Sequence, residues 1–190
     1  MFTSFATPDR TAEERQLATY YYARSAFSIA WVIAVLGLAR SSPGMGAALL
    51  VVYPLWDALA NLVDGKRSGG LAKNRTQALN VIASLAVTAA VVVALPDMHR
   101  VLAVFGVWAI LSGLLQLSTG VRRWKAYGAQ WPMILSGLQS AGAGAAFIFQ
   151  AQAPAVPSIT TLVGYAGFGA FYYLVSAVSL SVRKWRARPA

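Results

Sequence analysis

The sequence predicts an all-α fold: a polytopic membrane protein whose six transmembrane helices form three parallel-repeat helical hairpins. Three observations predict this fold: apolar stretches of membrane-spanning length, basic residues gathered in alternate loops, and a pattern that recurs three times. Of the 190 residues, 57% are hydrophobic and 12% are charged, which is not the composition of an ordinary soluble domain. We therefore expect a single transmembrane domain over residues 1–190, with hairpin repeats at about 16–67, 75–125 and 130–186.

Each predicted helix is close to the ~20 residues that an α-helix needs to cross a ~30 Å hydrocarbon core. In order, the apolar stretches cover residues 20–39, 45–63, 78–95, 101–121, 132–150 and 159–182. Gly37 and Ala39 have the small-residue spacing of a signal-peptide cleavage site. The region before this stretch is long and contains Asp9, Glu13 and Glu14, unlike a signal peptide. We therefore expect the first stretch to remain as a helix.

Basic residues lie mainly on one side of the predicted membrane. Fourteen of the sixteen Lys and Arg residues fall in the N-terminal flank, the second and fourth loops and the C-terminal tail. The other two are Arg40 and Arg100. Because positive charge in short loops resists translocation, we expect the basic side, with both termini, to be cytoplasmic. We expect the basic residues to contact anionic lipid headgroups, and no nucleic-acid-binding module is recognisable.

A pattern of proline, paired aromatics and paired basic residues recurs three times. Proline suits the turn after each odd-numbered helix: Pro43, Pro96 and Pro154. In each even-numbered helix, two aromatic residues three positions apart share a face and can pack on the partner helix: Tyr53 and Trp56, Phe105 and Trp108, Tyr165 and Phe168. Each unit ends in two adjacent basic residues. All three units begin and end on the same side, so we interpret them as parallel repeats.

Small residues form a candidate helix-packing face on the fourth and fifth helices. Small side chains let helix backbones approach closely in a membrane. The face comprises Gly106, Gly113 and Gly120, which recur every seven residues, and Gly137, Ala141 and Ala145. We expect these two helices to pack tightly, either inside the bundle or against another subunit of a homo-oligomer.

Asp57 is the most informative polar residue, because it lies near the middle of the second predicted helix. A carboxylate there costs roughly 2.5–3.5 kcal/mol on insertion scales, so it should face the bundle interior. Asn61 and Asp64 follow on the same helix face. Antiparallel pairing of the first three helices brings Arg24 and Asn80 to the same level. These five residues form the candidate polar or ion site.

Two interpretations of this cluster stay open. In one, it is a proton- or cation-handling site or a polar ligand pocket, because buried ionisable groups mark such pathways. In the other, it is an ion pair with hydrogen bonds that hold the first three helices in register. Asp64 lies near the membrane interface, where we expect it to be solvated. The second and third hairpins contain no comparable carboxylate.

Other polar residues give weaker signals. His99, the only histidine, is a candidate pH sensor, with an exposed loop histidine as the alternative. Gln116 and Gln139 are level in their hairpin and predict an interhelical hydrogen bond. The chain has no Cys, and no nucleophile–base pair, metal-ligand spacing or P-loop is apparent. We expect no enzyme activity, no metal and no cofactor.

The fourth and fifth helices carry a recognisable pattern. It comprises residues 104–116 (VFGVWAILSGLLQ), Arg122-Arg123, Trp131 and 134–138 (ILSGL). In this pattern the chain resembles the HdeD acid-resistance membrane proteins, whose six helices form two-helix repeats. Asn61 and Tyr173 stand where the corresponding positions of the family pattern have glycine, and Asp57 is not part of it. The resemblance implies a multi-pass protein of a bacterial inner membrane, associated with acid or envelope stress.

The predicted function follows from these observations and the resemblance. We expect a non-enzymatic integral membrane protein of the acid-resistance type that modulates the passage of protons or small ions. One alternative is a small-molecule transporter or channel that uses the Asp57 cluster as its polar site. Another is a membrane scaffold that binds a partner through the fourth and fifth helices.

Overall fold

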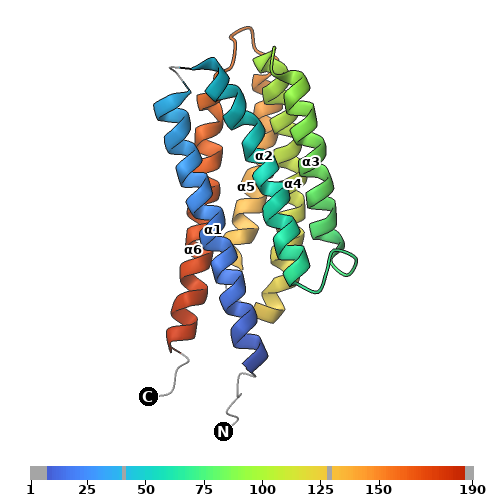
Figure 1. The fold of residues 1–190 in the computed structure, drawn as a ribbon, viewed down its shortest axis with the longest axis vertical. Helices are drawn as coiled ribbons and strands as arrows, with labels where there is room; N and C mark the ends of the chain where they lie inside the picture. The colour runs from blue at the N-terminus through green and yellow to red at the C-terminus, as the bar shows by residue number, and fades with distance from the viewer. Residues whose placement is uncertain (1–7, 40–41, 128–129, 187–190) are drawn as a thin grey trace.

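Six long α-helices make up the computed structural model, which describes residues 8–39, 42–127 and 130–186 (Figure 1). Their bounds are α1 (Pro8–Leu38), α2 (Pro43–Arg67), α3 (Arg75–Ala94), α4 (Met98–Tyr127), α5 (Trp131–Gln150) and α6 (Val163–Arg186), with a short 3-10 helix, η1 (Ile159–Leu162), before α6. All six are long and apolar enough to cross a membrane. The described ranges contain no strand. The predicted all-α, six-span fold is confirmed.

The helix ends follow local sequence signals. Ser42 caps α2: its Oγ accepts a hydrogen bond from the Met45 amide at 3.3 Å, and Pro43 occupies the first helical position, where its missing N–H costs nothing. The turn between α2 and α3 contains Gly69 and Gly70 with φ of 93° and 95°, a conformation that glycine adopts at no steric cost. Arg40, which was predicted to lie on the opposite side of the membrane from the α2–α3 turn, is outside the described residues.

The six helices form a closed ring in chain order, because each packs mainly on its two sequence neighbours and α6 returns to α1. The closest pairs are α4 with α5, α1 with α6, and α2 with α3. Each of these pairs joins helices of two different hairpins rather than the two helices of one hairpin. In Figure 1, α1 and α6 lie side by side at one edge, and α3 and α4 lie at the other.

Paired aromatics explain why α1 and α2 stay farther apart than α4 and α5. Trp56 stacks on Phe27 with ring centroids 4.5 Å apart, and Tyr53 packs on Trp31 at 4.7 Å. The predicted packing of the first aromatic pair on its partner helix is therefore confirmed. Large rings between two backbones hold them apart, whereas small residues let them touch.

Glycines bring α4 and α5 into backbone contact, as predicted. A Cβ on Gly113 would lie 2.6 Å from the carbonyl oxygen of Gly137, and a Cβ on Gly137 would lie 2.7 Å from that of Gly113. Gly106 and Gly120 make similar close contacts nearer the two ends of α4. Ala145 is exposed, and Gly144 takes its place against Gly106. The helical period brings residue 144, not 145, back to the face of Gly137.

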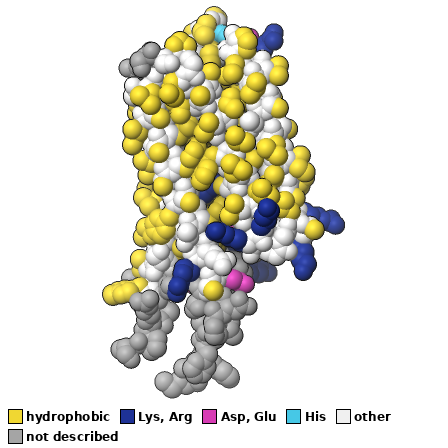
Figure 2. Space-filling view, viewed as in Figure 1, with side chains coloured by type: hydrophobic (Ala, Val, Ile, Leu, Met, Phe, Trp, Pro, Cys, Tyr) yellow, Lys and Arg dark blue, Asp and Glu magenta, His cyan; other side chains and the backbone are white. Residues whose placement is uncertain are grey.

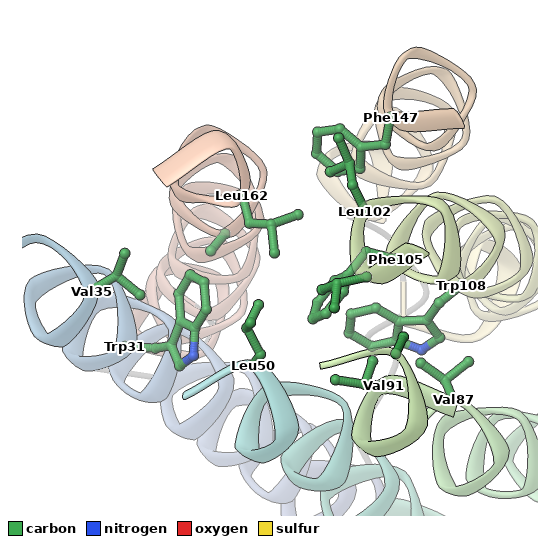
Figure 3. Packing of buried hydrophobic residues seen from close by; sticks show 13 residues of the cluster. Trp31, Val35, Leu50, Val87, Val91, Leu102, Phe105, Trp108, Phe147 and Leu162 are labelled. Atoms are coloured by element: carbon green, nitrogen blue, oxygen red, sulfur yellow. The ribbon is translucent and has the colours of Figure 1, made fainter. Parts of the chain in front are cut away.

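An apolar cluster fills one end of the ring with side chains from every helix. Figure 3 shows Trp31, Leu50, Phe105, Phe147 and Leu162 around the middle of the bundle. This end also contains His99 and Arg100. We call it the apolar end, and the opposite end, where α1 begins and α6 ends, the basic end.

The outer surface suits a lipid environment. Hydrophobic side chains are spread over the upper part of the face in Figure 2, and most of the Lys and Arg side chains gather toward the basic end. Large apolar side chains such as Ile33, Ile82, Val93 and Phe149 are more than half exposed. An apolar surface of this extent on helices of spanning length is typical of a multi-pass membrane protein.

Candidate functional site

A central cavity of about 320 Å³ lies inside the ring, and residues of all six helices line it. Tyr53, Trp108 and Tyr165 lie in the part of its wall that adjoins the apolar cluster, with Trp108 edge-on to Tyr53 at 5.7 Å and to Tyr165 at 6.4 Å between centroids. Its remaining lining is a mixture of aromatic rings, hydroxyls and amides. A concave site with aromatic walls and a few polar groups has the character of a small-molecule site.

Asp57 is at the centre of a hydrogen-bond network in the cavity wall. Its side chain is buried, with the residue 5% exposed. Its Oδ1 is paired with Arg24 Nη2, and its Oδ2 accepts hydrogen bonds from Asn61 Nδ2 at 3.0 Å and Ser84 Oγ at 2.7 Å. Ser84 Oγ in turn accepts a hydrogen bond from Trp108 Nε1 at 3.1 Å. The network joins α1, α2, α3 and α4.

The planar guanidinium group of Arg24 makes three further contacts with aromatic residues. Its Nη1 donates to the Tyr20 hydroxyl at 3.1 Å, and its Cζ lies 4.6 Å from the centroid of the Tyr173 ring and 5.8 Å from that of Tyr20. Cation–π contacts of this kind strengthen when they are desolvated. Tyr173 thus supplies a ring to the cation that pairs with Asp57.

Asp64 belongs to a second, separate ion pair. Its Oδ2 accepts a hydrogen bond from Arg123 Nη2 at 2.8 Å and another from Gln77 Nε2. Asp64 is 6% exposed, so the prediction that it is solvated was wrong. The reason is that Arg123 turns inward from α4 instead of anchoring the helix end at the headgroups.

Asn80 lies in the cavity wall without a protein partner. It is 6% exposed and lines the cavity, and its amide makes no hydrogen bond to any residue in the described ranges. In the described ranges, the fully buried side-chain atoms without a hydrogen-bond partner are Trp56 Nε1, whose residue also lines the cavity, and Ser176 Oγ; the Asn80 amide is not one of them and is accessible from the cavity. The Asn80 amide therefore offers a donor and an acceptor to whatever enters the cavity.

The two ends of the cavity are closed differently. Toward the apolar end lies the thick cluster shown in Figure 3. Toward the basic end lies a second cavity, also of about 320 Å³, with Glu13, Gln16 and Arg67 in its wall. Tyr20 and Arg123 line both cavities. A thin polar layer, which we call the basic-end layer and define by Tyr20, Asp64 and Arg123, thus separates the central cavity from the basic end.

The predicted site residues are brought together only in part. Arg24, Asp57, Asn61 and Asn80 all line the central cavity, as expected, whereas Asp64 lies in the basic-end layer. Helix α3 presents Gln77, Asn80 and Ser84 along one face. That polar stripe was present in the sequence at helical spacing, so Gln77 and Ser84 were detectable there. Arg123 was missed because it adjoins the exposed Arg122 and resembles a membrane anchor.

The remaining predicted polar residues lie in other places. His99 is in the first turn of α4, at the apolar end, and its Nδ1 lies 3.1 Å from the carbonyl oxygen of Ala151. It is not part of the Asp57 network. Gln116 bonds to the Met133 carbonyl and the Tyr173 hydroxyl, not to Gln139 as predicted. Within the described ranges, no group of three or more His, Asp or Glu side chains could hold a metal ion.

Comparison with known proteins adds no family to this geometry. No family model matches the sequence, and no curated protein or solved structure matches it either. The function must therefore be argued from the cavity itself.

Proposed function

We propose that this membrane protein binds a small molecule in its central cavity and transports it, as a carrier or channel does. The observation that supports the proposal best is the cavity walled by all six helices, with the Asn80 amide and the buried, unpartnered Trp56 Nε1 in its lining. Pockets of a few hundred cubic ångströms with aromatic walls and few convergent polar groups are typical ligand sites.

The charges in the wall constrain the ligand. Arg24 is neutralised by Asp57, and Arg123 by Asp64. A ligand with a net charge would enter this low-dielectric site without a counter-charge, which is costly. An uncharged or zwitterionic molecule with hydrogen-bonding groups is the class that fits.

The proposed orientation places the basic end in the cytoplasm of a bacterial inner membrane, by the positive-inside rule. The basic-end layer is thin and polar, whereas the opposite end is closed by the apolar cluster. In this conformation, exchange of a water-borne molecule with solution therefore favours the cytoplasmic side.

A thermal-unfolding screen of the purified protein tests the proposal. Glycerol, glycine betaine and glycerophosphocholine are added separately to wild type, Asn80→Leu and Thr88→Val; Thr88 is on the same helix but does not line the cavity. A solute at 100 times its Kd stabilises by about 2.7 kcal/mol, so it raises the midpoint of wild type and Thr88→Val but not of Asn80→Leu. Equal shifts in all three proteins would contradict the proposal.

Passage of protons or small ions, with a role in acid resistance, is a second candidate. Two buried carboxylates on α2, both paired with arginine, favour it, because such groups mark ion pathways in membrane proteins. The test is pyranine-reported proton flux in proteoliposomes under an imposed pH gradient. This candidate requires flux by wild type that Asp57→Asn loses while remaining folded; no flux from folded wild type removes it.

The scaffold alternative has less support. The small-residue faces of α4 and α5 are buried against each other, so they are not presented to a partner.

A further inference from the structure

On one side of the ring, residues that line the cavity are exposed on the outer surface. Among the residues that line the central cavity, the exposed ones are Ala146 on α5 and Gly164 and Phe168 on α6; every other lining residue is buried or half-buried. Phe168 has 55% of its surface exposed. A residue that both lines the cavity and reaches the outer surface marks a place where the two are continuous.

The seam between α5 and α6 is open around the glycines of α6, while Tyr165 of α6 contacts Phe147 and Ser140 of α5. A Cβ on Gly164 or on Gly169, which line the cavity, would meet no atom within 4 Å. On the other side of α5, by contrast, Gly137 and Gly144 are in backbone contact with α4. The seam faces the apolar outer surface of helices that span the membrane, so whatever passes through it comes from the bilayer.

We propose that the α5–α6 seam is a lateral portal through which a membrane-borne amphipathic ligand enters the central cavity. The inference rests on the proposed function and names its ligand class: one apolar chain or ring attached to an uncharged or zwitterionic head. The head reaches the buried Asn80 amide, and the apolar part lies in the seam beside Phe168.

The order of side chains along the route supports this ligand. At the mouth, Ala146 and Phe168 are apolar and exposed. Half-buried Gln139 and Tyr172 follow in the cavity wall, and the fully walled interior contains Asn80. The protein's hydrogen-bonding groups are therefore kept away from the hydrocarbon, where exposing them would be costly. A molecule that enters with its head inward meets these groups inside the cavity.

The chain has no Cys, so a single introduced thiol reports access to the cavity. Ser112→Cys is nearly isosteric, and Ser112 lines the cavity from α4. Gly164→Trp fills the portal. Gly167→Trp is the matched control, since it is on the same helix, also has open space around its Cβ and does not line the cavity.

The assay measures labelling rates of Ser112→Cys in proteoliposomes. The reagents are N-dodecylmaleimide, which partitions into the bilayer, and a charged, water-soluble methanethiosulfonate. We expect Gly164→Trp to slow N-dodecylmaleimide by about tenfold, because it raises the barrier to entry, and Gly167→Trp to leave the rate unchanged. Lysophosphatidylcholine, with one chain and a zwitterionic head, should slow labelling by small N-ethylmaleimide in the Gly167→Trp protein only.

Each contrary result has its own meaning. Equal rates of N-dodecylmaleimide labelling in the two tryptophan variants would overturn the portal. Faster labelling by the charged methanethiosulfonate than by N-dodecylmaleimide would place entry at the basic end, and cavity binding would remain. No protection by lysophosphatidylcholine would overturn the ligand class. A change from dimer to monomer on Gly164→Trp, seen by light scattering, would show that a second copy covers the seam. No labelling by N-ethylmaleimide would overturn the proposed function too.

Discussion

Removing one partner of the ion pair between Arg24 and Asp57 should destabilise the fold more than removing both. We expect Arg24→Met to lower the free energy of unfolding by about 3–5 kcal/mol, because it leaves a buried carboxylate without its cation. Asp57 would keep the hydrogen bonds from Asn61 at 3.0 Å and Ser84 at 2.7 Å. These two donors place the expected loss toward the lower end of that range.

The double variant Arg24→Met/Asp57→Leu removes both charges and should lose less. Asn61 keeps its hydrogen bond to the backbone oxygen of residue 57, and Ser84 keeps the one from Trp108. Both variants lose the hydrogen bond from Arg24 to Tyr20; beyond it, the double variant loses the two side-chain hydrogen bonds from Asn61 and Ser84 to Asp57, at roughly 1 kcal/mol each. The double variant should therefore be more stable than Arg24→Met alone.

Equilibrium unfolding in mixed micelles of dodecyl maltoside and sodium dodecyl sulfate, followed by tryptophan fluorescence, measures both variants. A double variant no more stable than Arg24→Met, or an Arg24→Met protein within about 0.5 kcal/mol of wild type, would refute the reasoning. Either result would mean that water reaches the pair and screens it.

Two further predictions concern packing and access. Gly113→Leu should lower the free energy of unfolding by about 1–3 kcal/mol, because its Cβ would meet the Gly137 carbonyl oxygen at 2.6 Å. The control is Gly142→Leu, which has open space around its Cβ. Its free energy of unfolding should stay within about 0.5 kcal/mol of wild type in the same assay. Tyr20→Ala should open the basic-end layer and speed labelling of Ser112→Cys by the charged methanethiosulfonate about tenfold; an unchanged rate would show that Tyr20 does not limit access.

The helices were predictable from the sequence because membrane-spanning length and apolar content are local properties. All six spans were found, but α1 begins at Pro8, well before the predicted residue 20, since its first turns are polar and carry no hydropathy signal. The contact of α4 with α5 was predictable from Gly113 and Gly137. Closure of the ring by α6 on α1 was not, because no local pattern specifies which non-consecutive helices meet.

The site was predictable where one helix carried the signal. Asp57 and Asn61 share a face of α2, and antiparallel pairing gave their neighbours Arg24 and Asn80. The inward turn of Arg123 depends on the distance from α4 to Asp64 on α2, which arises only in the assembled ring. The cavity itself is a property of all six helices together, so sequence reasoning supplied its polar residues but not its shape or its open side.

Reactivity of a single thiol toward N-ethylmaleimide in folded protein tests the central claim most directly. Ser112→Cys places the thiol in the cavity wall, and Ser176→Cys places it on α6 at a fully buried position that does not line the cavity. If the central cavity is accessible, Ser112→Cys should react at least about tenfold faster than Ser176→Cys, because buried thiols are inert. Equally slow labelling of both would show that nothing enters the ring, and would contradict a ligand site there.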